Sequence, residues 1–271
     1  MKALLVPCFP GELGWELINY APYVNYIYSQ KPYQEVHVVT RAGREAIYPM
    51  GTHFYPIDLS SKDSMGNNGP VASCNTLVQI LSKRFKVKKI EFPLNGCTYV
   101  EPRSFIKYKA NEENLKKWEH IKPNSVVLCI RGRRFGSHKN WNSSNWLSLC
   151  NYLLSLNLVP VITGIKESIQ FDIPTGCVNL WDQTSIGDLI SIMQKSKLVI
   201  GQSTGPMHLA ALCGIPHVVW GSRRIQERYL DTWNPHKTMV EYHNCGKNDF
   251  NCSFEDIKPL IDKFCKNENR I

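Results

Sequence analysis

The stretch KLVIGQSTGPMHLAALCGIPHVVW, residues 197–220, gives the clearest indication of the fold class. In it an apolar run is followed by a polar turn, a helical pattern and a second apolar run. Ser203 and Thr204 are helix-capping residues. Pro206 suits a first helical turn, and Gly214 is a typical helix end. The stretch therefore predicts a strand, a helix and a second, parallel strand joined by a right-handed crossover.

The polar turn of this stretch lies where the first strand ends. The backbone N–H groups of Gly205, Met207 and His208 and the positive end of the helix dipole would face an incoming ligand there. Such a helix start suits a phosphate group. A capped helix start without any ligand explains the same residues, so this stretch alone leaves both interpretations open.

Apolar runs and helical patterns alternate along much of the chain. Helices are predicted from residue 13 and over 71–85, 143–155 and 184–196, and strands over 2–6, 35–39, 125–130, 158–164 and 197–201. This order is typical of an α/β protein with parallel sheets covered on both faces. The polar segment 109–124 predicts a domain boundary, which gives an N-terminal domain at 1–112 and a C-terminal domain at 113–271.

Composition limits the partners. The chain has 271 residues, of which 43% are hydrophobic, and a net charge of +9. Nucleotides, phosphorylated glycans, nucleic acid and anionic membrane surfaces all suit that charge. No apolar run approaches the length of a membrane span, and the N-terminal apolar run is too short for a signal peptide, so we expect a cytoplasmic protein.

The cysteines fit the same compartment. There are ten, no two have CxxC spacing, and most lie in apolar runs as small core residues. Cys245 and Cys252 are the only pair in a loop-like setting. The sequence favours neither a metal site nor a disulfide for this pair.

Two segments carry a resemblance to a known family. Residues 184–221, TSIGDLISIMQKSKLVIGQSTGPMHLAALCGIPHVVWG, resemble the C-terminal signature of the ADP-heptose:lipopolysaccharide heptosyltransferase family. The segments VVLCIRGRRFGSHKNW (126–141) and VPVITG (159–164), with a helix between them, are similar to the same family's preceding strand, loop, helix and strand.

The resemblance implies a GT-B fold, with two facing Rossmann-like domains, parallel sheets and an interdomain cleft. It also implies an inverting glycosyltransferase that moves a sugar from a nucleotide-diphosphate sugar to a glycan, a glycolipid or another hydroxyl acceptor. In this family the donor lies in the C-terminal domain and the acceptor mainly in the N-terminal domain. Peripheral contact with an anionic membrane surface fits the net charge of +9, and no nucleic acid is expected.

The donor-side residues follow from the resemblance and from phosphate chemistry. Lys139 matches the family's phosphate-side lysine, and arginines of the same loop can clamp phosphate. Thr163 and Gly164 end a strand beyond which a base or ribose would lie. The predicted donor-binding residues are Arg131, Arg133, Lys139, Thr163, Gly164, Ser203, Thr204, Gly205, Pro206, Met207 and His208. The sequence has no DxD triplet, so we expect no metal and no cofactor besides the donor substrate.

Transfer also needs a base for the acceptor hydroxyl. The segment PGELGWELINYAP, 10–22, offers Glu12 and Glu16. The family places an aspartate after a glycine and six residues before a proline. Counting back from Pro22 favours Glu16, whereas counting forward from the first strand favours Glu12. We expect Glu16 to be the catalytic base, with Glu12 a close second, although a helix N-terminus favours carboxylates for purely structural reasons.

Two other classes of protein fit parts of the sequence. A basic nucleic-acid-binding α/β protein would use the loop RGRRFGSHK, 131–139, but the chain shows no aromatic platform or known nucleic-acid module. A Rossmann oxidoreductase would need GxGxxG after its first strand, where this chain has PCFPGELG. The glycosyltransferase is therefore the favoured hypothesis, and the nucleic-acid-binding protein is the alternative.

Overall fold

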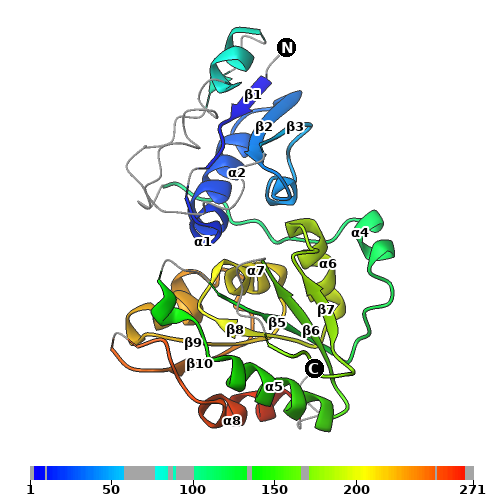
Figure 1. The fold of residues 1–271 in the computed structure, drawn as a ribbon. Coiled ribbons are helices and arrows are strands. Elements are labelled where there is room, and N and C mark those ends of the chain that lie inside the picture. The colour runs from blue at the N-terminus through cyan, green and yellow to red at the C-terminus, as the bar shows by residue number, and fades with distance from the viewer. Residues whose placement is uncertain are drawn as a thin grey trace. The chain divides into compact units, whose positions relative to one another are not determined.

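The computed structural model describes residues 3–9, 11–57, 77–84, 88–89, 101–132, 136–165, 171–247 and 249–265. The chain divides into two compact units (Figure 1). The N-terminal unit comprises Met1–Ile106 with Ser185–Gly187, and the C-terminal unit comprises Lys107–Thr184 with Asp188–Ile271. Each unit has a parallel sheet of its own, as the alternation of strands and helices predicts.

The N-terminal unit has a four-stranded sheet in the order β3-β2-β1-β4. Its strands are β1 (Ala3–Val6), β2 (Glu35–Arg41), β3 (His53–Ile57) and β4 (Lys88–Lys89), and all pairs are parallel. The chain runs outward from β1 to β3 and then returns to place β4 on the other side of β1. The strand order therefore reverses between β1 and β4, which is where open α/β sheets bind ligands.

A helical segment follows β1 and carries both candidate carboxylates. It consists of α1 (Leu13–Trp15), a π-helical turn η1 (Glu16–Tyr20) and α2 (Ala21–Ser29). A short 3₁₀ turn, η2 (Glu45–Ile47), follows β2, and residues 77–84 are also helical. A π-helical turn inside an α-helix is rare and is often found at a functional site.

The C-terminal unit has a six-stranded parallel sheet in the order β10-β9-β8-β5-β6-β7. The strands are β5 (Ser125–Cys129), β6 (Val159–Gly164), β7 (Val178–Trp181), β8 (Leu198–Gln202), β9 (His217–Gly221) and β10 (Val240–Asn244). From β5 the chain builds β6 and β7 on one side, and then returns to build β8, β9 and β10 on the other. The reversal point of this sheet therefore lies between β5 and β8.

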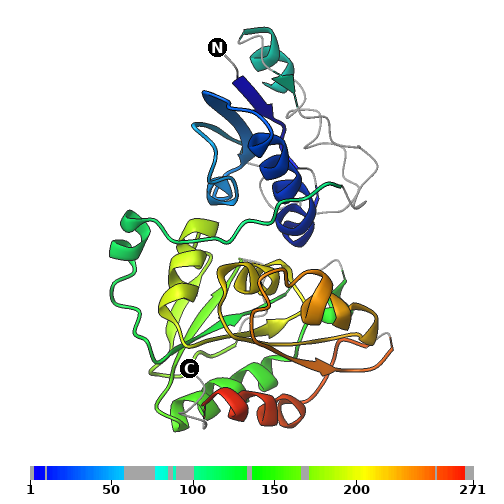
Figure 2. The ribbon, with the colours of Figure 1, turned by 180° about the vertical axis from the view of Figure 1, so that it is seen from behind.

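Helices cover both faces of this sheet (Figures 1 and 2). On one face α5 (Ser143–Ser155) packs beside α8 (Phe254–Cys265). The other face carries α6 (Ile186–Lys195), α7 (Gly205–Cys213) and the π-helical turn η5 (Arg228–Thr232). Shorter helical pieces are α4 (Glu112–Lys117), η3 (Ser137–Lys139) and η4 (Arg223–Ile225).

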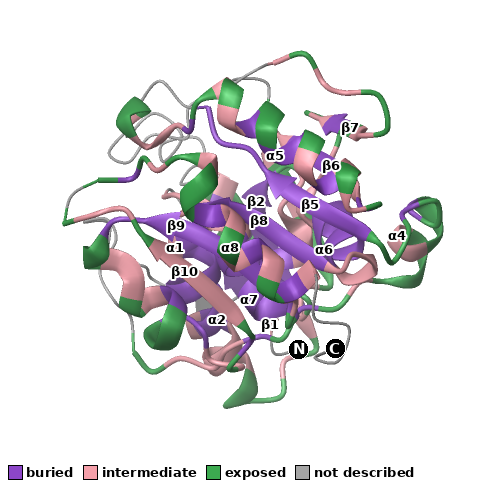
Figure 3. Ribbon diagram, turned by 90° about the horizontal axis from the view of Figure 1, so that it is seen from below, coloured by how far each residue is buried: buried purple, intermediate pink, exposed green. Residues whose placement is uncertain are grey.

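The core of the C-terminal unit is built on the central strands, where β5, β8 and β9 are buried while β10 is half-buried (Figure 3). Three fully buried tryptophans, Trp141, Trp146 and Trp220, join the α5 side of this sheet. The ring centroid of Trp141 lies 4.9 Å from that of Trp146 and 4.5 Å from that of Trp220. Their buried area fixes the start of α5 and the loop that precedes it.

Polar contacts with α6 hold the first segment of the C-terminal unit. The carboxylate of Asp188 accepts hydrogen bonds from Trp118 Nε1 at 2.6 Å and from Lys117 Nζ at 2.8 Å. Gln194 binds the backbone of Tyr108 and Ala110.

In the part of the chain that the structure describes, no helix has the length and apolarity needed to cross a membrane.

Candidate functional site

The reversal point between β5 and β8 brings the predicted donor-side segments to one edge of the sheet. Cys129 at the end of β5 pairs with Gly201 near the end of β8. The chain leaves β5 there at Ile130, and the turn that opens α7 leaves β8 beside it. Ligands of open parallel sheets collect at such an edge, outside the carboxyl ends of the strands.

A buried amide ties these two segments together. The side-chain amide of Gln202, which is 1% exposed, donates a hydrogen bond of 2.7 Å to the main-chain carbonyl of Lys139. The ammonium of Lys139 lies over the ring of Phe250, 4.5 Å from its centroid. Asn251 donates to the main-chain carbonyl of His138 at 3.2 Å. The sequence did not indicate Gln202 or Phe250, because each contacts Lys139, which is far from both in the chain.

Arg131 lies inside its loop. Its side chain is largely buried, and its guanidinium donates to the carbonyl of Gly136 at 3.0 Å and to the side-chain oxygen of Asn140. Gly136 has φ of 67°, a left-handed conformation that glycine adopts without strain. Arg131 therefore braces the loop that carries Lys139. Arg133 lies outside the described residues.

The start of α7 differs in detail from the expected set of three N–H donors. The N–H of Met207 already donates to the carbonyl of Thr204 at 3.1 Å, and Pro206 has no N–H. The hydroxyl of Thr204 donates to the carbonyl of Gln202 at 3.2 Å. Among the described residues, no acceptor takes the N–H of Gly205. That N–H and the helix dipole are therefore available to an anion at this turn.

His208 and Ser203 face an aromatic cluster beneath the turn. The imidazole of His208 stacks on Tyr229, with centroids 4.4 Å apart, and meets the edge of Trp233 at 4.7 Å. Burial, aided by the nearby charge of Arg228, lowers the pKa of His208 to about 3, so the ring is neutral at physiological pH. The hydroxyl of Ser203 accepts a hydrogen bond of 2.9 Å from Tyr229.

The end of β6 offers less side-chain chemistry than its sequence suggests. The hydroxyl of Thr163, which is 3% exposed, donates to the carbonyl of Leu128 at 3.1 Å inside the sheet. Gly164 ends the strand half-buried, and its carbonyl accepts from the N–H of Asp182 at 2.9 Å. The hydroxyl of Thr163 is therefore engaged in a hydrogen bond between two strands of the sheet.

In the N-terminal unit, Glu16 forms a buried polar cluster. Its carboxylate accepts a hydrogen bond of 2.6 Å from the guanidinium of Arg44 and one of 2.7 Å from the phenol of Tyr48. Only 2% of the Glu16 side chain is exposed. Burial and the adjacent Glu16 charge raise the pKa of Tyr48 well above its ordinary value. The phenol therefore stays protonated and donates a hydrogen bond to Glu16.

Glu12 has a different environment. It is half-buried at the N-cap position of α1, and its carbonyl accepts from the N–H of Glu16 at 3.1 Å, while its side chain does not cap the helix. A Cβ on the preceding Gly11 would lie 2.6 Å from the ring of Phe9. Phe9 in turn stacks on Tyr20, with centroids 5.4 Å apart. Glu12 is thus half-buried, whereas the side chain of Glu16 is almost completely buried.

Comparison with known proteins defines the class of this molecule. Solved structures with the same arrangement of two parallel α/β sheets are glycosyltransferases of the GT-B type. The family model of glycosyltransferase family 9 (heptosyltransferase) matches residues 88–257. The chain belongs to this family and is a glycosyltransferase. Among curated proteins, none matches the chain.

Three solved structures illustrate the similarity. The E. coli ADP-heptose lps heptosyltransferase II has a TM-score of 0.66 at 13% identity, over 99% of this chain and 99% of that one. The glycosyl transferase family 9 protein from Veillonella parvula DSM 2008 has a TM-score of 0.63 at 13% identity, over 99% and 91%. The E. coli heptosyltransferase WaaC with ADP-2-deoxy-2-fluoro heptose has a TM-score of 0.57 at 13% identity, over 97% and 99%.

Proposed function

We propose that this glycosyltransferase is inverting and metal-independent, and that it moves a sugar from a nucleotide-diphosphate sugar to a hydroxyl of a glycan or glycolipid. One observation carries the proposal. At the reversal point between β5 and β8, Gln202 holds the backbone of Lys139 beside the start of α7. The backbone of Lys139 and the N–H of Gly205 thus lie outside the carboxyl ends of these strands, an edge at which open parallel sheets commonly bind nucleotides. The WaaC structure that contains an ADP-sugar analogue supports a nucleotide-sugar donor.

In this proposal the donor's diphosphate lies between Lys139 and the N–H of Gly205. Negative charge grows on the diphosphate as the bond from the anomeric carbon to the phosphate oxygen breaks. A fixed cation and a fixed N–H stabilise that charge more strongly in the transition state than in the bound donor. Because these groups belong to the protein, the departure of the diphosphate needs no metal ion.

We assign the base to Glu12 rather than to Glu16. The carboxylate of Glu16 is almost inaccessible and holds both Arg44 and Tyr48. Glu12 is half-buried, directly follows a glycine and lies in the loop after β1, next to the strand-order reversal of its sheet. The acceptor oxygen attacks the anomeric carbon opposite the diphosphate, a new C–O bond forms, and Glu12 takes the hydroxyl proton.

Charge and the cysteines support the acceptor and the compartment that we propose. A net charge of +9 supports an anionic glycan or glycolipid acceptor and peripheral contact with an anionic membrane surface. Core cysteines such as Cys129, Cys150 and Cys213 are free thiols, which fits a reducing, cytoplasmic compartment.

A transfer assay tests this function. A panel of nucleotide sugars is incubated with the full chain and glycan acceptors, and the anomeric configuration of the product is read by NMR. We expect an anomeric configuration opposite to that of the donor, and a rate that neither Mg²⁺ nor Mn²⁺ raises. Retention of configuration, or a strict requirement for either ion, would overturn the corresponding part of the proposal.

A further inference from the structure

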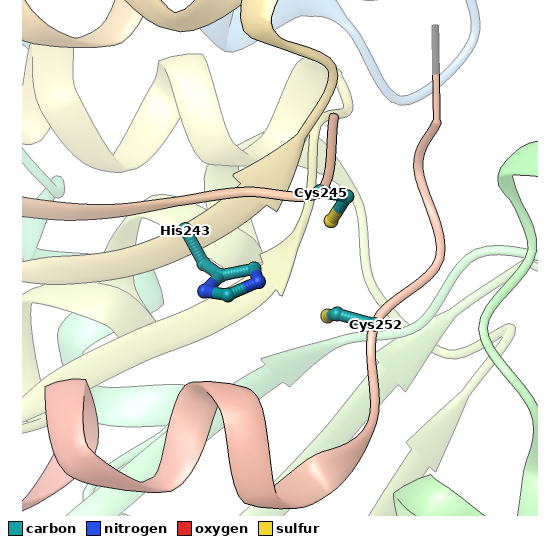
Figure 4. Close-up of side chains that lie close together, drawn as sticks. All are labelled: His243, Cys245 and Cys252. Atoms are coloured by element: carbon teal, nitrogen blue, oxygen red, sulfur yellow. The ribbon is translucent and has the colours of Figure 1, made fainter. Parts of the chain in front are cut away.

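Three metal-binding side chains converge beside the end of β10. The imidazole of His243 and the thiols of Cys245 and Cys252 point toward one another (Figure 4). Their ligand atoms all lie within 4.8 Å of one another, and all three residues are partly buried. Both cysteines are free thiols. We propose that these three residues bind a Zn²⁺ ion.

The local structure explains how the three side chains meet. His243 lies near the end of β10, and Cys245 directly follows Asn244, the last residue of that strand. Residues two apart in an extended chain point to the same side, so the two side chains can meet. Cys252 comes from the segment that leads into α8. Its carbonyl accepts hydrogen bonds from the indole of Trp141 at 2.6 Å and from Asn145 at 3.4 Å, which hold Cys252 opposite the strand.

The ligand set suits zinc. Zn–S bonds of about 2.3 Å and Zn–N bonds of about 2.0 Å in a tetrahedron require ligand atoms roughly 3.5–3.8 Å apart. Ligand atoms within 4.8 Å of one another reach that spacing by small side-chain rotations. Two thiolates and an imidazole are soft to borderline donors, which favour Zn²⁺ over Mg²⁺ or Ca²⁺. A solvent molecule would complete the tetrahedron.

The surrounding charge also favours a cation. Two carboxylates of the same segment, Asp249 and Asp256, act electrostatically on the thiol of Cys252. Asp249 and Asp256 thus place negative charge close to the thiols. Asp256 accepts hydrogen bonds of 2.7 Å from the N–H and the hydroxyl of Ser253, and one oxygen of Asp249 accepts from the N–H groups of Phe250 and Asn251. These aspartates therefore complement the ion's charge while they shape the loop.

Zinc at this place would fasten the loop 245–252 to the strand ends. The carbonyl of Gly246 accepts from the N–H of Arg223, and the carbonyl of Lys247 accepts from the hydroxyl of Ser222 at the end of β9. The same loop carries Phe250, which lies under the ammonium of Lys139. Insofar as Lys139 binds the donor, as proposed above, the ion would help to position it. The role that we infer for the ion is to hold this loop in place.

A disulfide between Cys245 and Cys252 is the chemical alternative. It would cross-link the same loop, but it does not explain why the imidazole of His243 is turned toward both sulfur atoms (Figure 4). The two possibilities differ in oxidation state and metal content, so one preparation distinguishes them.

The test measures bound metal in the full chain, purified under reducing conditions without chelator. Mass spectrometry of the metals should find roughly one zinc per chain. The variants Cys245→Ser, Cys252→Ser and His243→Gln should each lose most of it. Cys177→Ser, which alters another partly buried free cysteine, is the matched control and should keep the ion. Addition of Co²⁺ to the metal-free protein should give the visible absorption of a thiolate-bound tetrahedral ion.

Several results would overturn the inference. They are a wild-type chain without metal that also fails to bind Co²⁺, a Cys245–Cys252 disulfide in the intact mass, or zinc retained by all three variants. Another metal at the same stoichiometry would overturn the assignment of zinc. If a cysteine variant does not fold, chelation of the wild-type chain replaces it, and a lower Tm that Zn²⁺ restores is expected. None of these readouts depends on transferase activity, so they stand apart from the proposed function.

Discussion

The amide of Gln202 reaches across the reversal point of the C-terminal sheet to the main-chain carbonyl of Lys139, at 2.7 Å. The bond joins the end of β8 to a loop that leaves β5, two segments that are 63 residues apart in the chain. It fixes where the lysine backbone lies relative to the start of α7. In the proposed donor site, Gln202 therefore acts by positioning the loop that carries Lys139.

Replacing Gln202 by leucine tests this dependence. The substitution keeps the volume and removes the buried hydrogen bond, which costs about 1 kcal/mol of folding stability. Because the Lys139 loop is then less well positioned, we expect donor KM to rise several-fold while kcat changes less. Gln183→Leu, an exposed glutamine on the same unit, is the control and should leave both constants unchanged. An unaltered donor KM in Gln202→Leu would remove the positioning role.

Lys139→Ala should impair both binding and chemistry. The charge that lysine neutralises grows as the diphosphate leaves, so we expect a higher donor KM together with a lower kcat. Lys122→Ala removes an exposed lysine at the far end of β5 and should behave as wild type. Steady-state kinetics of the two variants with one donor compare them directly. Equal effects of both substitutions would indicate a general charge effect on an anionic substrate and not a specific site.

The two carboxylates of the N-terminal loop should respond differently to amide substitution. Glu12→Gln should lower turnover by ~10²- to 10⁴-fold with donor binding nearly unchanged, the usual range for loss of a general base. Glu16→Gln removes the charge of Glu16 from its buried ion pair with Arg44, and should cost about 3 kcal/mol of folding stability. Kinetics and thermal unfolding of both variants separate these roles. A large loss of turnover in a stably folded Glu16→Gln protein would restore Glu16 as the base.

Buried histidines should make the fold sensitive to acid. Burial lowers the pKa of His208 to about 3 and that of His217 to about 4, from an ordinary 6.5. As the pH falls below 6.5, these two histidines bind protons in the unfolded chain but not in the folded chain. Their contribution to the free energy of unfolding is therefore complete above about pH 6.5 and decreases as the pH falls toward 4. His208→Phe keeps a ring against Tyr229 and removes one such group. Its Tm should fall less steeply than that of wild type between pH 7 and 5. Parallel curves would contradict a neutral, buried His208.

Local signals account for the parts of the fold that the sequence predicts. The helix over Ser143–Ser155 matches its prediction because Asn142 caps it through a hydrogen bond to the N–H of Ser144. The β8-α7-β9 unit follows from adjacent apolar runs and from Gly214, which has φ of 78° at the helix end. These features depend only on residues close together in the chain.

Features that depend on distant partners were not predictable. Strand β10, VEYHN, has few apolar residues because it is a half-buried edge strand. Strand β3 contains Pro56, which an edge strand tolerates. The π-helical turn that buries Glu16 has no sequence signal that we recognise. The meeting of His243 with Cys252 depends on how the chain returns from β10 to α8, which spacing alone does not specify.

Binding of a nucleoside diphosphate to the C-terminal unit is the most direct test of the proposed donor site. Calorimetry with ADP, UDP, GDP and dTDP, followed by thermal shift, compares the full wild-type chain with Lys139→Ala and Lys122→Ala. We predict that at least one of these nucleotides binds wild type and Lys122→Ala alike, raises their Tm, and binds Lys139→Ala at least several-fold more weakly. Failure of all four nucleotides to bind, with an oligonucleotide binding instead through the basic segment 131–139, would exclude the proposed donor site.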